Sequence, residues 1–238
     1  MAEFADRVVL VTGASGNLGR ALAQAFYEAG ASLVLADRRP DELSTLLPEL
    51  IADKGRVLWH PVDLTQPESA RALVSAAVDR FGRIDTVANS VGGFRSMPVD
   101  HAESLEMWDF VMNLNARTAL ILSQAVVPVM RQQGHGAIVH TSARAAHSGG
   151  KNIAAYSAAK AAVIRLVESL AAELKDEGIT VNCVLPGTID TPENRAERPN
   201  ADFSKWVSPE QMARVFLFLC SDAARAITGA AIPVYGRS

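Results

Sequence analysis

Short apolar segments alternate with longer amphipathic segments along the whole chain. Seven segments are rich in Val, Ile and Leu and mostly continuous in hydrophobicity, as expected for strands covered on both faces: residues 7–13, 32–37, 56–63, 84–90, 136–142, 179–187 and 230–236. Apolar positions recur with a helical period in the intervening segments: 18–29, 41–53, 67–81, 103–133, 155–177 and 209–221. This alternation predicts an α/β fold, a doubly wound parallel seven-stranded sheet with helices on both faces.

The breaks in the pattern predict one domain over residues 1–238. Gly30, Gly82 and Gly178 each follow a helical segment, where glycine can take the left-handed conformation that ends a helix. No repeat or linker interrupts the chain. One irregular stretch, 188–210, is polar, contains three prolines and is too long for an ordinary connection. We expect it to form a substrate lid.

Composition limits the binding partners and the cellular compartment that we expect for this protein. The net charge is −3 and the basic residues are scattered, so we expect no nucleic acid and no anionic membrane as a partner. Cys183 and Cys220 lie in apolar runs, which predicts buried, reduced cysteines. The first residues lack a signal-peptide pattern, and no window reaches the roughly 18–20 apolar residues that span a bilayer. A cytoplasmic protein is therefore expected.

Three glycines connect the first predicted strand to the first predicted helix. In "VTGASGNLGRALA", Gly13, Gly16 and Gly19 are three residues apart. In a dinucleotide-binding turn, such glycines allow a tight bend, a close approach of backbone N–H groups to the pyrophosphate, and close packing of helix on strand. The phosphate then lies at the helix N-terminus. The position of this turn predicts nucleotide binding.

Three further strand ends carry candidate cofactor ligands. Asp37 ends the second strand, where a carboxylate can accept hydrogen bonds from ribose hydroxyls and repel a 2′-phosphate, which favours NAD(H) over NADP(H). Arg38 and Arg39 follow, and either a 2′-phosphate contact or a solvated pair remains open. Asp63 is placed to bind the adenine amino group or to cap the next helix. Residues 89–93, "NSVGG", allow a cofactor close to the backbone.

Tyr156 and Lys160 are the candidate catalytic pair. Residues four apart share one face of a helix, so the Lys160 ammonium is expected near the Tyr156 phenol. A fixed positive neighbour favours the phenolate and should lower the phenol pKa from about 10 toward the working pH. Such a tyrosine donates its proton to a carbonyl oxygen or imine nitrogen as hydride arrives, or accepts it in reverse.

With these residues, the chain resembles a single-domain short-chain dehydrogenase/reductase of the Rossmann type. "TGASGNLG", "ANSVGG", "WDFVMNLNA", "YSAAK" and "VLPGTIDT" occur in the family's order and spacing over nearly the whole chain. The resemblance implies an NAD(P)(H)-dependent oxidoreductase that acts on a carbonyl, alcohol or conjugated imine, with Tyr156 as acid/base and Lys160 on the nicotinamide ribose. It also implies that Asn115 fixes a water in the proton relay. The implied cofactor-binding residues are Gly13, Ser15, Gly16, Asn17, Leu18, Asp37, Asp63, Leu64, Asn89, Val91, Gly92, Tyr156, Lys160, Pro186, Gly187, Ile189 and Thr191.

The sequence departs from the family pattern at two positions. Asn17 stands at the middle glycine position of the first motif, and Asn tolerates the left-handed conformation that this turn is expected to need. Ala143 stands thirteen residues before Tyr156, where the family usually has the serine that orients the substrate. Ser142, through a one-residue bulge, is a candidate replacement or else bonds only backbone. Ser148 and His147 are further candidates.

The missing hydroxyl also gives a local similarity to quinonoid dihydropteridine reductases, which place Ala before the Tyr. Their acceptor is an activated electrophile that needs less polarisation than a ketone. An alternative of another class is a nucleotide-sensing scaffold without turnover, which has no need of the relay that Tyr156, Lys160 and Asn115 imply. The five histidines have no ligand spacing, so no metal site is expected.

For some other side chains the sequence allows either of two roles. Phe94 and Arg95 follow the fourth strand, and Arg95 either meets an anionic substrate or faces solvent. Phe203 and Trp206 in the lid either cover the substrate or pin the lid to the core. Family resemblance further implies a homodimer or homotetramer formed through the long helices before and within the Tyr156 segment.

Overall fold

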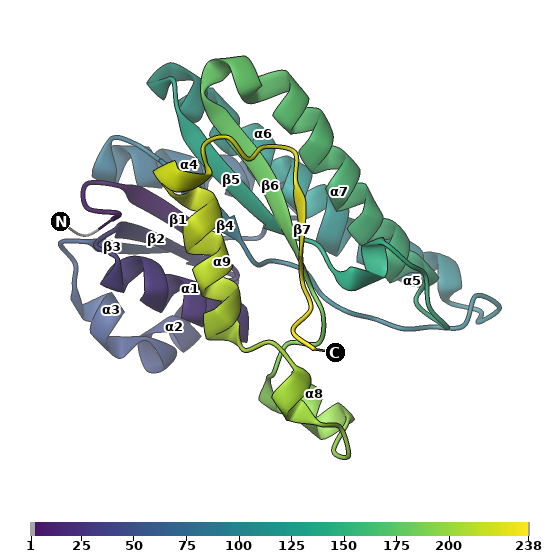
Figure 1. Cartoon of the computed structure of the whole chain (residues 1–238). Coiled ribbons are helices and arrows are strands. Elements are labelled where there is room, and N and C mark those ends of the chain that lie inside the picture. Colours follow the sequence, from purple (N-terminus) through teal and green to yellow (C-terminus); the bar gives the residue numbers. More distant parts are fainter. Residues whose placement is uncertain (1–2, 238) are drawn as a thin grey trace.

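Parallel strands form one seven-stranded sheet in the computed structural model, which describes residues 3–237 (Figure 1). The spatial order is β3-β2-β1-β4-β5-β6-β7, and every neighbouring pair is parallel. The strands are β1 (Val8–Thr12), β2 (Ser32–Asp37), β3 (Val57–Pro61), β4 (Thr86–Asn89), β5 (Gly136–Thr141), β6 (Ile179–Pro186) and β7 (Ala231–Val234). The predicted doubly wound sheet is confirmed.

Helices cover both faces of this sheet, as the continuous hydrophobicity of its strands requires. One layer contains α1 (Asn17–Glu28), α2 (Pro40–Leu46), α3 (Pro48–Ala52) and α9 (Pro209–Cys220). The other contains α4 (Pro67–Phe81), α6 (Thr118–Gln133) and α7 (Ala154–Leu174), with α5 (Ser104–Met112) packed on α7. Side chains alternate along β1, so Leu10 packs in one core and Val9 in the other.

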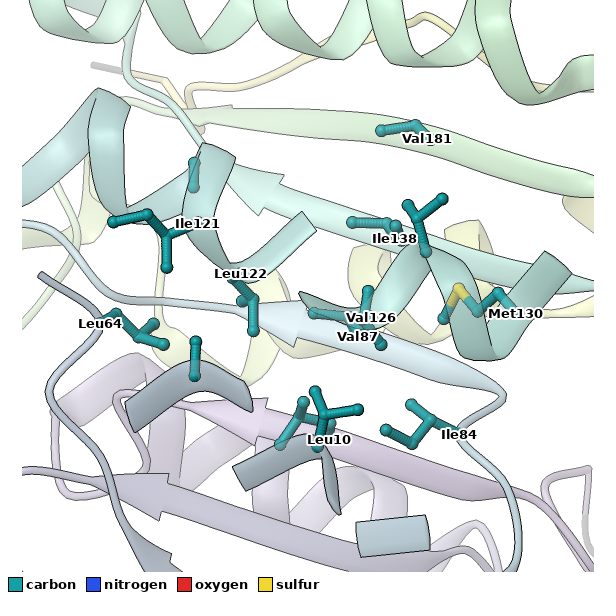
Figure 2. Close-up of a cluster of buried hydrophobic side chains, with 14 of the residues drawn as sticks. Leu10, Leu64, Ile84, Val87, Ile121, Leu122, Val126, Met130, Ile138 and Val181 are labelled. Carbon is teal, nitrogen blue, oxygen red and sulfur yellow. The ribbon is translucent and has the colours of Figure 1, made fainter. Parts of the chain in front are cut away.

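The core beneath α6 shows how the second layer is held. Leu122, Val126 and Met130 project from α6 toward Val87 and Ile138 of the sheet, and all five side chains are buried (Figure 2). The combined stretch Ser104–Gln133 is long and apolar enough to cross a membrane by length and composition, but half of its most apolar part is buried inside the protein. Because core helices satisfy the same criteria, the burial of these side chains identifies α6 as a core helix.

Two predicted helices are divided in the structure. The segment 41–53 forms α2 and α3, separated at Leu47, whose φ of −134° and ψ of 54° lie outside the helical region. Pro48 follows Leu47, and a residue before proline is disfavoured from helical geometry. The segment 103–133 contains a π-helical turn, η1 (Asn113–Arg117), between α5 and α6. Such turns concentrate at functional sites.

The predicted lid segment, 188–210, leaves the carboxyl end of β6 and contains α8 (Pro192–Glu197) and a short 3₁₀ turn, η4 (Phe203–Lys205). A parallel bridge between Ile189 and Val207 closes its base. Figure 1 shows α8 projecting away from the sheet, near the C-terminus.

A crevice lies where the strand order reverses. From β1 the chain winds outward through β2 to β3, whereas β4 lies on the other side of β1 and leads outward to β7. In open α/β sheets, ligands bind at such a switch point, outside the carboxyl ends of the strands. Gly13, Asp37 and residues 89–93 all lie at this edge.

Candidate active site

The turn between β1 and α1 has no room for side chains at two of its glycines. Gly13 has a φ of +71°, and a Cβ on Gly19 would lie 2.0 Å from the Gly13 carbonyl oxygen. No side-chain hydrogen bond caps the N-terminus of α1, whose N-cap is Gly16. The free N–H groups and the helix dipole therefore favour an anion at this point.

Asn17 does not take the left-handed conformation that its family position led us to expect. It is the first residue of α1, and Gly13 alone in residues 13–19 has a positive φ. The Asn17 side chain instead donates from Nδ2 to Glu193 Oε2 at 2.9 Å and accepts from Arg20 Nη2 at 2.6 Å. The glycine turn is thus bonded directly to the first turn of α8.

Asp37 is held at the edge of a cavity of about 180 Å³. Its Oδ2 accepts from the Ser15 backbone N at 3.1 Å, and its Oδ1 accepts from the Arg39 N at 3.2 Å. The Arg39 guanidinium bonds Ser15 Oγ at 2.9 Å and pairs with Glu42 at 3.1 Å. Arg38 and Arg39 both line this cavity with Asp37, so a carboxylate and two cations face the same space.

Asp63 and Leu64 line the same cavity. The Asp63 Oδ1 accepts from Thr65 Oγ1 at 2.7 Å and from Thr65 N at 3.0 Å, which lowers the pKa of the carboxyl. These bonds form a local turn before α4. The same carboxylate therefore serves the turn and faces the cavity.

The Asn89 side chain is engaged inside the protein. Its Oδ1 accepts from Thr12 Oγ1 at 2.7 Å and from Val91 N at 3.1 Å, and its Nδ2 lies 2.9 Å from His140 Nδ1. Asn89 therefore ties β4 to β1 and β5 and does not line the cavity, whereas Val91 and Gly92 do.

His140 continues this buried polar network from β5 to α6. Its Nε2 lies 3.0 Å from Ser123 Oγ, which itself donates to the Ala119 carbonyl at 2.9 Å. The ring must therefore donate from Nε2 and accept at Nδ1, which is the neutral form. Burial, with the nearby Lys160 charge, lowers the pKa of His140 to about 4.

A second cavity of about 800 Å³ is lined by Tyr156 and Lys160. Asn115 does not line it but lies with Lys160 against Gly92. Tyr156 and Lys160 project from the first two turns of α7, and the Lys160 Nζ lies 5.8 Å from the Tyr156 ring centroid. A Cβ on Gly92 would lie 2.7 Å from Asn115 Oδ1 and 2.9 Å from Lys160 Nζ, so both groups lie against this glycine. Phe94 packs edge-on against Tyr156 at 5.0 Å.

Hydrogen bonds fix Lys160 and Asn115. The Lys160 Nζ donates to the Thr141 carbonyl at 2.9 Å. Asn115, within the π-helical turn, donates to the carbonyls of Val111 at 2.9 Å and Gly93 at 3.1 Å, and accepts from the Gly93 N at 3.1 Å. The amide is therefore locked to the loop after β4.

Burial sets the protonation of the pair, and it corrects the expected direction for Tyr156. Burial raises the pKa of Tyr156 to about 12, so the phenol is neutral at ordinary pH. Burial also lowers the pKa of Lys160 to about 8. The ammonium is directed at the Thr141 carbonyl, and its charge does not offset the desolvation of the phenol.

The wall beside Tyr156 lacks a hydroxyl at Ala143, which is 6% exposed and lines the cavity. The Ser142 Oγ donates to the Lys160 carbonyl at 2.7 Å and is fully buried. Its O–H is thus used within the protein, which is the backbone-bonding role considered for it. Ser148 lines the cavity, whereas His147 bonds the Tyr235 hydroxyl at 3.4 Å.

The far wall comes from the end of β6 and the lid. Pro186, Gly187, Ile189 and Trp206 line the cavity. Thr191 does not line the cavity. Its hydroxyl instead caps α8 by accepting a hydrogen bond from Asn194 N at 3.3 Å. Phe203 packs on Trp206 with ring centroids 4.9 Å apart.

The structure brings most of the expected residues to two adjoining cavities. The smaller cavity is lined by Gly13, Gly16, Asp37, Asp63, Leu64, Val91 and Gly92. The larger is lined by Leu18, Gly92, Ser142, Tyr156, Lys160, Pro186, Gly187 and Ile189. The remaining expected residues do not line either cavity: Ser15, Asn17, Asn89, Asn115 and Thr191.

Sequence reasoning missed several lining residues. Arg144, Asn194 and Arg198 are polar examples that line the larger cavity. Arg144 follows Ala143 directly, and its position beside the expected serine was the available signal. Asn194 and Arg198 lie in a segment without periodicity, where the sequence gives no indication of orientation.

Known proteins match this chain over nearly its full length. A family model described as enoyl-(acyl carrier protein) reductase matches residues 13–236. The chain is 32% identical to the 3-oxoacyl-(acyl-carrier-protein) reductase FabG of Thermotoga maritima, over 97% of this chain and 96% of that protein. It is 34% identical to BbsD of Thauera aromatica, a subunit of a hydroxy(phenyl)methyl-succinyl-CoA dehydrogenase, over 97% and 96% of the two chains.

A solved structure also matches this chain over nearly its full length. The short-chain type dehydrogenase/reductase from Mycobacterium ulcerans matches with a TM-score of 0.92 at 30% identity, over 99% of this chain and 90% of that chain. None of these three proteins is described as a dihydropteridine reductase, so they do not support the local similarity to quinonoid dihydropteridine reductases.

Proposed function

Since the chain belongs to the short-chain dehydrogenase/reductase family, whose members are NAD(P)(H)-dependent oxidoreductases, we propose that it transfers hydride between NAD(H) and a carbonyl or alcohol. Tyr156 exchanges the proton in this proposal. One observation carries it: the two cavities share the lining residues Ser90 and Gly92, so the space beside Asp37 adjoins the space beside Tyr156. An extended dinucleotide with its reactive end beside an acid/base needs this arrangement.

The residues present fit such a cofactor. The uncapped N-terminus of α1 suits the pyrophosphate, and Asp37 and Asp63 face the adenosine end. Lys160, Pro186, Gly187 and Ile189 line the larger cavity. In this proposal Lys160 holds the nicotinamide ribose and the other three hold the carboxamide. The bound nicotinamide ring would supply or accept the hydride. A side chain at Gly92 would collide with Asn115 and Lys160, so the glycine lets both groups lie against the loop after β4.

NAD(H) is preferred over NADP(H) in this proposal. Asp37 is fixed by two backbone N–H groups at the end of β2. In this proposal it accepts hydrogen bonds from the adenosine ribose hydroxyls and repels a 2′-phosphate. The Arg39 guanidinium is already paired with Glu42 and bonded to Ser15. Part of the positive charge of Arg39 that could balance a 2′-phosphate is therefore already paired with Glu42.

Tyr156 acts as proton donor during reduction. With a pKa raised to about 12 by burial, the phenol is protonated at neutral pH and ready to give its proton to a carbonyl oxygen. Lys160 and the locked Asn115 lie behind it, where they can relay a replacement proton through water. In oxidation the same groups work in reverse, and Lys160 favours the phenolate as the proton leaves.

Substitution of Tyr156 tests the proposal. General acid catalysis contributes about 10²–10⁴-fold, so Tyr156→Phe should reduce turnover by that amount while NADH binding, followed by fluorescence, persists. Tyr27→Phe is the matched control, because the Tyr27 hydroxyl bonds Asp53 and lines neither cavity. Unchanged turnover in Tyr156→Phe would refute the role. Tight NADH binding without turnover of any carbonyl would favour the nucleotide-sensing scaffold instead.

We further propose a homodimer or homotetramer in the cytoplasm. The face formed by α5, η1, α6 and α7 exposes Phe110 and Leu120 around a concavity of about 710 Å³. An exposed apolar surface of this kind marks an interaction site. The buried, unpaired cysteines Cys183 and Cys220 are consistent with a reducing compartment.

A further inference from the structure

The lid contacts the glycine turn through a carboxylate. Glu193, in the first turn of α8, accepts a hydrogen bond of 2.9 Å from the Asn17 side chain, and Asn17 is the first residue of α1. The Asn17 Oδ1 in turn accepts from Arg20 Nη2 at 2.6 Å. The Glu193 carboxylate therefore lies one hydrogen bond away from the helix end at which the proposed function places the cofactor pyrophosphate.

This end of α1 is favourable for a negative charge, and the helix itself does not supply one. Its first turn contains no acidic residue, and no side-chain hydrogen bond caps it. Unpaired N–H groups and the helix dipole favour a carboxylate or a phosphate at an N-terminus. Arg20 adds a positive charge, and its Nε is buried without a hydrogen-bond partner among the described residues. A carboxylate from α8 thus lies at a position that favours anions.

Glu193 is ionised at this position. Hydrogen bonds from its own backbone N–H and from the Thr191 hydroxyl, followed by the bond from Asn17 and the charge of Arg20, hold the pKa of the carboxyl below its ordinary value. Among the described residues, no lysine or arginine forms a salt bridge with this carboxylate. Its negative charge is therefore not neutralised by direct pairing and can act on a second anion.

We propose that Glu193 is a residue that sets cofactor affinity: its carboxylate opposes the pyrophosphate of NAD(H) at the N-terminus of α1, and the cofactor displaces it on binding. The inference rests on the proposed function, which places the pyrophosphate at this helix end. Two anionic groups near one helix end repel each other, so the internal carboxylate weakens binding of the external anion. Because Asn17 and Glu193 join the glycine turn to α8, the displacement also breaks this link.

A carboxylate that opposes the pyrophosphate acts equally on the oxidised and the reduced cofactor. It weakens binding of NAD⁺ and NADH by the same factor, because the two differ at the nicotinamide ring and share the pyrophosphate. A carboxylate close to the ring would instead favour NAD⁺, whose ring is positively charged. Weaker binding of both forms speeds cofactor release, a step that limits turnover in many enzymes.

Removal of the charge alone tests the inference in the full chain. Glu193→Gln keeps the shape of the side chain and an oxygen that can accept from Asn17, but it carries no charge. We expect this variant to bind NADH, NAD⁺ and ADP-ribose about 3- to 10-fold more tightly than the wild type, the effect of removing one like charge near a partly exposed anion. Fluorescence titration measures NADH, and displacement of NADH measures the other two ligands.

A matched control removes the same charge from the other end of α1. Glu28 is the last residue of this helix, accepts from Gln24 Nε2 at 2.7 Å and lines neither cavity. Glu28→Gln should leave all three affinities unchanged, which separates a local effect from a change of net charge. The gain in Glu193→Gln should also shrink as NaCl is raised to about 1 M, where the Debye length is about 3 Å.

The outcomes separate the inference from the proposed function. Equal or weaker binding of NADH by Glu193→Gln overturns the inference and leaves the proposed hydride transfer intact. Tighter binding of NADH with weaker binding of NAD⁺ also overturns it, as does an equal gain in Glu28→Gln or a gain that salt does not reduce. Failure of the folded wild type and of both folded variants, checked by circular dichroism, to bind NADH overturns both the inference and the proposed function.

Discussion

Single side chains of the active site have their protonation set by burial more than by their partners. Spacing along the chain predicted that Tyr156 and Lys160 share a face of α7, and they do. The expected lowering of the tyrosine pKa came from the same spacing and was wrong, because desolvation raises the pKa of Tyr156 to about 12. Desolvation depends on how the loops after β4 and β5 cover the helix, which local spacing does not report.

Ala143 gives the first prediction at the scale of one residue. Ala143→Ser should raise kcat/KM for a neutral ketone by about 2- to 10-fold, because a neutral hydrogen bond is worth about 0.5–1.5 kcal/mol. Ala145→Ser is the control, since Ala145 lines the same cavity but does not occupy the position thirteen residues before Tyr156. No gain in Ala143→Ser would mean that another donor, such as Ser148, already serves.

His140 gives a prediction about stability. Its folded pKa of about 4 lies below the ordinary 6.5, so the unfolded chain binds a proton that the folded chain does not between these values. Stability should therefore fall as pH drops from 6.5 toward 4, by roughly 2–3 kcal/mol at 1.36 kcal/mol per pKa unit.

Urea denaturation at pH 7 and pH 4.5 measures this loss. His140→Gln should be less stable at pH 7, because it disturbs the bonds to Asn89 and Ser123, but it should lose less stability between the two pH values. His101→Gln, at an exposed position, should keep the wild-type pH dependence. The same loss in His140→Gln as in the wild type would contradict the assignment.

At the scale of elements, hydrophobic periodicity predicted where the helices lie but not where they are interrupted. Residues 103–133 read as one helix because apolar positions continue through η1, where the π-helical turn shifts the register without breaking the pattern. This turn presents Asn115 to Gly93, so the interruption matters for the site. The break before Pro48 had a local cause and was readable from proline sterics.

The contact between α1 and α8 gives an element-scale prediction. Asn17 and Glu193 join the glycine turn to the lid through one hydrogen bond of 2.9 Å. Asn17→Gly removes it, and an exposed hydrogen bond of about 0.5–1.5 kcal/mol corresponds to an increase of up to about tenfold in α8 opening.

Hydrogen exchange of the α8 amides measures this opening. Glu197→Gln on the same helix is the control, because no hydrogen bond or ion pair of its side chain is found among the described residues. Equal exchange in Asn17→Gly and the wild type would show that the lid is held by its other contacts, such as the Asn194 bond to the Ile189 carbonyl.

At the scale of the whole molecule, the sequence was most informative about topology. Buried parallel strands, a glycine turn after the first strand and carboxylates at strand ends were sufficient to predict the sheet and the edge that carries the site. The convergence of Arg95, Arg144 and Arg198 was not predictable, because they lie in irregular loops from three parts of the chain. Only the folded sheet edge brings these loops together.

Self-association of the protein is the prediction that concerns its surface as a whole. Phe110 and Leu120 are 47% and 49% exposed and line the concavity between α5, α6 and α7, next to Leu166. A second copy would bury this surface, and in a two-fold interface each substituted residue occurs twice. Burial of one leucine is worth about 1.5–3 kcal/mol, so Leu120→Glu should weaken a dimer by more than about 100-fold.

Sedimentation at micromolar concentration distinguishes the alternatives. The wild type should sediment as a dimer or tetramer, and Leu120→Glu as a smaller species that still binds NADH. Phe218 on α9 is 48% exposed in the opposite helical layer, so Phe218→Glu tests a competing interface. Dissociation by Phe218→Glu alone would move the contact to α9. A monomeric wild type would mean that the apolar face of α5, α6 and α7 does not serve for association with a second copy.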